Sequence, residues 1–186
     1  QWEKLIELDP YYHSAYYQLA SVYKEENMID KAYDAVMEGL KYDEFNKELY
    51  FLAGQLSFTK GKEKDAILYL EKAIELDYDY QEAILALIEI YRENNEYEKI
   101  IALLTDIKQS GATDPIYDWE LAKAYETVED YEKALSAYEE ASVYLQHESE
   151  FLKEYGYFLV EEGLSHKAIE ILEHYLEHVP DDEEVI

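Results

Sequence analysis

The sequence LAKAYETVEDYEKALSAYEEA at residues 121–141 places small side chains among bulky ones at helical spacing. Ala122 and Ala134 are small, and Tyr125 and Tyr138 follow them three or four positions later. Side chains three, four and seven residues apart lie on one stripe of an α-helix, as in an amphipathic helix packed against a neighbour. The stretch therefore predicts helices that pack through one face.

The same offsets recur every 34 residues along the 186-residue chain. Three columns of small residues share this period: Ala20, Gly54, Ala122 and Gly156; Ala32, Ala66, Ala134 and Ala168; and Gly39, Ala73 and Ala141. Packed helix axes lie about 8–10 Å apart, and their closest crossing admits only a small residue. We therefore expect neighbouring helices to touch at these columns.

Each repeat contains a break between its two halves. The breaks fall at Glu26-Asn27, Lys60-Gly61, Asn94-Asn95 and Glu162-Gly163. Glycine and asparagine are typical of positions where a helix ends and the chain reverses. Each repeat is thus predicted to be an antiparallel pair of helices, and the pairs must stack because one pair cannot cover both of its apolar faces.

The repeat resembles that of the tetratricopeptide-repeat family, whose 34-residue pattern alternates aromatic, small and leucine positions. Two copies fit it closely: Tyr16-Leu19-Ala20-Tyr23-Ala32 and Leu121-Ala122-Tyr125-Tyr131-Ala134-Tyr138-Ala141. The resemblance implies an all-α fold, a right-handed α-solenoid of antiparallel helix pairs, with a concave groove lined by the first helix of each pair.

The register divides residues 1–186 as a single array. We expect the end of a preceding repeat at 1–12, five repeats at 13–46, 47–80, 81–114, 115–148 and 149–182, and the start of a further repeat at 183–186. Neither end has a polar capping helix and the chain begins at Gln1, so we expect it to come from a longer protein.

The third repeat departs from the pattern because Ile88, Ile100 and Ile107 occupy columns that are small elsewhere. Larger side chains at a close crossing would cost about 1–3 kcal/mol if the helices kept their usual separation. We therefore predict a wider helix crossing in residues 81–114 than in the other repeats.

The composition disfavours several classes of ligand. The formal net charge of −28 would repel nucleic acid and anionic membrane surfaces. The chain has no cysteine and no apolar run long enough for membrane insertion, which favours a cytoplasmic protein. The single arginine against fifteen lysines favours a bacterial origin.

The sequence predicts no enzyme and no cofactor. It contains no glycine-rich phosphate loop, no His-Glu-x-x-His and no nucleophile elbow. The glutamate-rich runs are interpreted as solvated helix faces and helix starts.

In this family the groove is formed by first-helix positions that point away from the core. Projecting the register gives three rows: Tyr17, Phe51, Leu85, Trp119 and Lys153; Ser21, Gln55, Glu89, Lys123 and Tyr157; and Lys24, Phe58, Arg92, Glu126 and Val160. Aromatic and aliphatic side chains recur there, although no structural column requires them. Exposed apolar rows often mark a binding surface, so these rows are the predicted partner-binding site. Alternatively, the side chains merely pack against neighbouring first helices.

The predicted partner is another protein or peptide with apolar anchors and basic flanks, because the groove is framed by acidic residues. Relatives that grip acidic chaperone tails use a clamp of Lys, Asn and Arg, whereas the corresponding places here hold Tyr17, Ser21, Leu52, Glu82 and Ala86. Two other roles stay open: self-association through the repeat ends, giving a homo-oligomer, and a regulatory sensor arm of a larger enzyme.

His174 and His178 are one helical turn apart, with Glu170 and Glu177 nearby. This spacing permits a transition-metal pair. Surface histidines are common, however, and the sequence alone predicts no metal site here.

Overall fold

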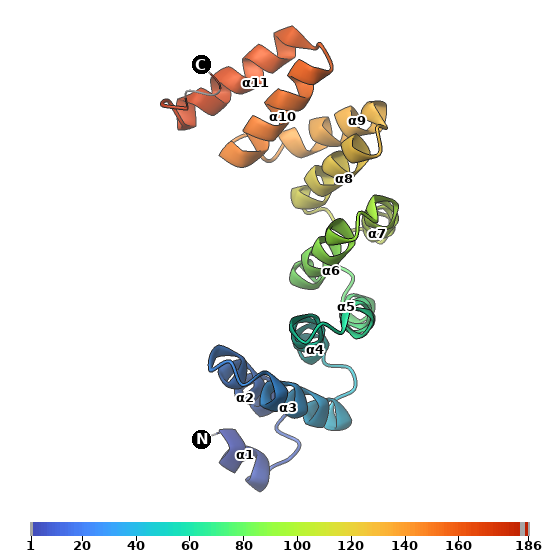
Figure 1. Cartoon of the computed structure of the whole chain (residues 1–186), viewed down its shortest axis with the longest axis vertical. Coiled ribbons are helices and arrows are strands. Elements are labelled where there is room, and N and C mark those ends of the chain that lie inside the picture. The colour runs from blue at the N-terminus through green and yellow to red at the C-terminus, as the bar shows by residue number, and fades with distance from the viewer. Residues whose placement is uncertain (1, 183–184, 186) are drawn as a thin grey trace. The chain divides into compact units, whose positions relative to one another are not determined.

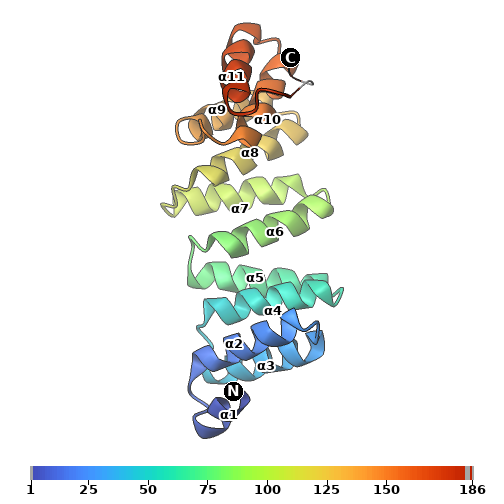
Figure 2. The same ribbon diagram turned by 90° about the vertical axis from the view of Figure 1, so that its left-hand side faces the viewer.

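The computed structural model describes residues 2–182 and residue 185, and all regular structure in this part of the chain is α-helical (Figures 1 and 2). The chain forms two compact units, Gln1–Asn95 and Glu96–Ile186. The first unit contains α1 (Trp2–Leu8), α2 (His13–Glu25), α3 (Ile29–Tyr42), α4 (Lys47–Thr59), α5 (Glu63–Leu76) and α6 (Gln81–Glu93). The second contains α7 (Tyr97–Gln109), α8 (Pro115–Thr127), α9 (Tyr131–Ser142), α10 (Ser149–Glu161) and α11 (Ser165–His178). None of the helices in the described ranges has the length and apolar character needed to cross a bilayer.

In the first unit, α2 pairs with α3 and α4 pairs with α5, and α4 also contacts α2 and α6 (Figure 2). The core at the first two pairs contains Tyr16, Ala20, Ala32, Val36, Leu49, Leu52, Ala53 and Leu56, all buried. Three of these residues belong to the columns or motif that define the repeat: Tyr16, Ala20 and Ala32. The repeat pattern is therefore a pattern of core positions.

In the second unit, α8 pairs with α9 and α10 pairs with α11, while α7 packs on α8. Its core is aromatic. Tyr138 of α9 stacks on Tyr155 of α10 with ring centroids 5.1 Å apart, and Phe158 lies 4.9 Å from the Tyr138 ring. Aromatic side chains bury large areas and hold defined relative orientations, so this cluster fixes α10 against α9.

Glycines in the small columns lie where two helices meet. A Cβ atom added to Gly54 of α4 would lie 2.7 Å from Leu70 Cγ of α5, and one added to Gly156 of α10 would lie 2.6 Å from Leu172 Cγ of α11. A Cβ on Gly39 of α3 would lie 2.7 Å from Tyr16 Cβ. These distances are shorter than ordinary carbon contacts, so the steric explanation of the small columns is confirmed at these positions.

The turn inside each pair has the same backbone conformation in every repeat. Asn27, Gly61, Asn95, Glu129 and Gly163, which are 34 residues apart, have φ angles of 57°, 68°, 58°, 60° and 70°. The next amide after four of these residues bonds back to a carbonyl five positions earlier, as in Met28 N to Tyr23 O at 2.7 Å and Asp130 N to Tyr125 O at 2.9 Å. This is the Schellman pattern that ends helices. The left-handed residue thus reverses the chain.

The helix crossing in the third repeat and the start of a further repeat both stay predictions. The helices of the third repeat, α6 and α7, belong to different units, so the wider crossing in residues 81–114 stays a prediction. Ile88, Ile100 and Ile107 are all buried. The expected start of a further repeat at 183–186 lies largely outside the described residues, because Glu183, Glu184 and Ile186 are not described.

Candidate ligand-binding hollows

The first-helix face of the first unit contains a hollow of about 300 Å³, here called the α2–α6 hollow. Its lining comes from Lys24, Gly54, Gln55, Phe58, Thr59, Leu70, Ala86, Glu89 and Ile90. Four of the predicted site residues therefore meet in one place: Lys24, Gln55, Phe58 and Glu89.

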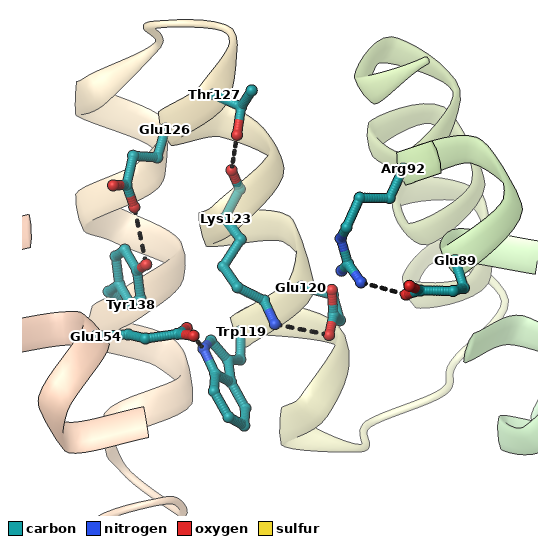
Figure 3. A network of polar contacts seen from close by, with 9 residues as sticks. All are labelled: Glu89, Arg92, Trp119, Glu120, Lys123, Glu126, Thr127, Tyr138 and Glu154. Carbon is teal, nitrogen blue, oxygen red and sulfur yellow. Dashed lines mark hydrogen bonds and ion pairs between the residues drawn. The ribbon is translucent and has the colours of Figure 1, made fainter. Parts of the chain in front are cut away.

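Polar contacts order the rim of the α2–α6 hollow. Lys24 Nζ donates to Gln55 Oε1 at 2.6 Å, which ties α2 to α4. On α6, Arg92 Nη1 donates to Glu89 Oε2 at 2.6 Å (Figure 3). Phe58 is 39 % exposed at this face. The hollow thus combines an exposed aromatic ring with a rim of both charges.

The remaining predicted residues of this unit are half-buried. Tyr17 packs against the core of the first two pairs, and the Phe51 ring meets Tyr80 edge-on with centroids 5.4 Å apart. Ser21 and Leu85 are also half-buried. Phe51 therefore packs on Tyr80, the residue that immediately precedes α6.

The second unit contains a hollow of about 320 Å³ between α8, α9 and α10, here called the α8–α10 hollow. Its lining comes from Lys123, Glu126, Thr127, Tyr138, Glu154, Tyr157, Phe158 and Glu161. Three residues of the predicted rows belong to it: Lys123, Glu126 and Tyr157. Three glutamates surround aromatic rings, so the hollow is acidic with an apolar wall.

The carboxylates of the α8–α10 hollow repel one another. Burial raises the pKa of the Glu126 carboxyl above its usual range, and the nearby Glu161, Glu154 and Glu162 raise it further. The Tyr138 hydroxyl donates to Glu126 Oε2 at 2.9 Å and partly offsets this effect (Figure 3). A raised carboxyl pKa means that the ionised form is disfavoured. A cation placed here would relieve that cost.

Trp119 requires a correction, because the sequence predicted an apolar side chain free to grip a ligand. The residue is only 8 % exposed. Its indole Nε1 donates to Glu154 Oε2 at 2.7 Å, and its ring meets Phe151 edge-on at 5.7 Å. Lys123 Nζ lies 4.4 Å from the ring centroid (Figure 3). Trp119 therefore packs α8 against α10 and holds Glu154, one of the residues that line the hollow.

Sequence reasoning missed part of the α8–α10 hollow. Tyr138 comes from a second helix, and Glu154, Phe158 and Glu161 lie beside the projected rows. A signal did exist for Glu154, since it follows Glu120 by one repeat length and Glu120 adjoins the rows at Trp119. The predicted rows include three positions of each first helix, whereas the hollow also contains other positions of α10.

A third hollow, of about 390 Å³, lies between α7, α8 and α9, away from the predicted rows. Lys108 Nζ on its lining pairs with Asp118 and with Glu140, the latter at 2.9 Å. Burial raises the pKa of the Asp118 carboxyl, against the opposing effect of Lys108. Because both carboxylates already pair with Lys108, they are less available to a charged ligand.

Two family models match the chain. The model described as a tetratricopeptide repeat matches residues 13–46 and 47–80. The model described as YpiA-like, C-terminal tetratricopeptide repeats matches residues 115–182. The chain belongs to the tetratricopeptide-repeat family. This confirms the resemblance and, with the helix pairs described above, the all-α solenoid class of the fold.

A curated relative has a closely similar sequence. The chain is 38% identical over 177 residues to the TPR repeat-containing protein YpiA of Bacillus subtilis (strain 168). The match covers 95% of this chain and 42% of that protein, so the chain spans less than half the length of this relative.

Solved structures show the same fold at low identity. YrrB, described as a TPR protein with an unusual peptide-binding site, matches with a TM-score of 0.71 and 17% identity over 100% of this chain and 95% of that one. PilW, a type IV pilus biogenesis factor, matches with a TM-score of 0.73 and 18% identity over 99% of this chain and 86% of that one. MamA from Desulfovibrio magneticus RS-1 matches with a TM-score of 0.72 and 16% identity over 92% of this chain and 97% of that one. Tetratricopeptide-repeat proteins, as a family, are generally non-enzymatic scaffolds that bind other proteins.

Proposed function

We propose that this chain is a protein-interaction scaffold whose first-helix faces bind a peptide segment of another protein. The α8–α10 hollow of the second unit takes a basic side chain of such a segment. The α2–α6 hollow of the first unit independently takes an apolar side chain, which packs against Phe58. The observation that carries the proposal is the convergence of Glu126, Glu154 and Glu161 around aromatic rings.

The α8–α10 hollow has the chemistry of a site for a lysine or arginine side chain. Its carboxylates supply the acceptors, and the exposed Tyr157 ring supplies an aromatic face on which a guanidinium can stack. Glu154 already accepts a hydrogen bond from Trp119, which holds its carboxylate in place. The site is therefore partly organised before a ligand arrives, which lowers the entropy lost on binding.

The α2–α6 hollow suits an apolar anchor. Phe58, Leu70 and Ile90 present carbon atoms to it, and the Lys24–Gln55 hydrogen bond closes one side. Aromatic anchors in small pockets contribute much of the affinity in peptide recognition. The description of YrrB as a peptide-binding protein supports a peptide ligand for this fold.

The test uses fluorescence anisotropy with labelled peptides that combine arginine and leucine, and with matched peptides in which glutamate replaces arginine. The Glu126→Gln/Glu161→Gln double variant should weaken binding of the basic peptide by about tenfold or more, equivalent to about 1.4 kcal/mol. The matched control is Glu98→Gln/Glu132→Gln, which removes the same charge from exposed positions of α7 and α9.

Two further readouts separate site binding from general attraction to an acidic protein. Binding should weaken with salt and strengthen as the pH rises through the raised pKa of Glu126, because the carboxylate must ionise to pair with a cation. Equal losses in the hollow and control variants, or equal affinity for the glutamate peptides, would contradict the proposal.

A further inference from the structure

Three histidines meet on the second unit. His174 and His178 lie on α11, and His147 lies in the segment between α9 and α10. One ligand nitrogen from each lies within 4.8 Å of those of the other two. The His147 ring centroid is 6.0 Å from that of His174 and 5.8 Å from that of His178. The sequence indicated only the pair, because folding alone brings His147 beside α11.

We propose that His147, His174 and His178 bind a late first-row divalent metal ion, with Zn²⁺ as the ion to test first. Neutral imidazole nitrogens are preferred ligands of Zn²⁺, Cu²⁺ and Ni²⁺. Two histidines one helical turn apart with a third from another segment, and one open position, form an arrangement that recurs in zinc sites. Acidic clusters favour Ca²⁺ or Mg²⁺ instead, so the donor set defines the class of metal.

A hydrogen bond prepares His178 for coordination. Its Nδ1 lies 3.0 Å from the His174 carbonyl oxygen. A carbonyl only accepts, so Nδ1 carries the proton and Nε2 keeps the lone pair that binds metal. Metal-binding histidines almost always donate their second ring nitrogen in this way, which fixes the ring orientation.

The remaining geometry requires a small closure. Tetrahedral bonds of about 2.0–2.1 Å place ligand nitrogens about 3.4 Å apart, compared with the 4.8 Å limit observed. His147 is exposed and can rotate toward His174 and His178 without disturbing the core. Glu177 Oε2 lies 3.9 Å from His174 Nε2 and adds negative charge beside the site.

The site would join two segments that the repeat pattern leaves separate. Residues 143–148 connect α9 to α10, and Val143 and Tyr144 in this connection are 64% and 72% exposed. A bound ion would tie this connection to the last turns of α11. Metal that binds only the folded form raises its stability, so the ion would act as a structural staple of the last repeat.

The experiment is isothermal titration calorimetry of the full chain, prepared without a histidine tag, with ZnCl₂ at pH 7.5. We expect one ion per chain. His147→Ala and His174→Ala should each weaken binding at least about tenfold. His166→Ala is the matched control, because His166 is an exposed histidine of α11 outside the cluster, and it should bind like the parent.

Thermal unfolding gives an independent readout. Zn²⁺ should raise the melting temperature of the parent and of His166→Ala, and should leave that of His147→Ala unchanged. Because His147 is exposed, its metal-free variant should melt like the parent. If Zn²⁺ binds His147→Ala as tightly as the parent, the ion binds surface carboxylates in general and the proposed site is wrong. The absence of one-to-one binding would also contradict the proposal.

Discussion

Glu129 holds a backbone conformation that its side chain disfavours. Its φ of 60° lies in the left-handed region, where the corresponding turns use asparagine or glycine. This conformation costs a residue other than glycine about 1–2 kcal/mol. Glycine avoids this cost, but its larger entropy in the unfolded chain removes part of the gain in stability. We expect Glu129→Gly to raise the free energy of unfolding by about 0.5–1 kcal/mol, measured by urea denaturation.

The equivalent position one repeat later supplies the control for this prediction. Gly163 has a φ of 70°, and a Cβ there would meet no atom within 4 Å. Gly163→Ala therefore adds backbone strain without a clash, and should lower the free energy of unfolding by about 1 kcal/mol. Similar effects of both substitutions would contradict the explanation by backbone strain.

The turns also show what the sequence could predict at the residue scale. Glycine or asparagine indicated the breaks at positions 27, 61, 95 and 163. The fourth turn was not marked because Glu129 carries no such signal, although the 34-residue period leads directly to it. The period alone leads to this position, whereas residue preference gives no sign of it.

At the scale of helix pairs, Gly156 sets how closely α10 approaches α11. A methyl group there would lie 2.6 Å from Leu172 Cγ, so Leu172 or the helix must move. We expect Gly156→Ala to lower the free energy of unfolding by about 1–3 kcal/mol, because the clash exceeds the gain in helix propensity of about 1 kcal/mol. Urea denaturation measures the change.

A double-mutant cycle isolates this contact. Leu172→Ala removes the atoms that the new methyl group would meet, so adding Gly156→Ala to that variant should be neutral or stabilising. If Gly156→Ala costs as much without Leu172 as with it, the small column does not act through helix contact.

The helix pairs follow from the sequence because small and apolar columns report which residues are buried. The binding faces follow less completely. A repeat register gives the direction of a side chain but not the residues of a neighbouring helix that pack on it. The register therefore does not predict that Phe151 and Glu154 of α10 cover Trp119. The α8–α10 hollow and the histidine cluster combine residues from several helices or connections, which a one-dimensional pattern does not align.

At the scale of the whole chain, the formal net charge of −28 opposes the folded state. Folding brings like charges closer together, and repulsion between them acts over about 10 Å at 0.1 M salt. Salt bridges such as Lys41 to Glu38 at 2.5 Å and Lys167 to Glu139 at 2.5 Å recover only part of this cost, since exposed pairs contribute little.

Screening should therefore stabilise the chain. We expect the melting temperature to rise by about 2–8 °C between 50 and 500 mM NaCl, which corresponds to about 1–2 kcal/mol for a chain of this size. The rise should shrink as the pH approaches the sequence pI of about 4.3, because the net charge falls there. If the melting temperature rises equally at pH 7.5 and pH 5, the cause is salt-dependent burial of apolar surface. Repulsion between carboxylates would then not limit the stability of this protein.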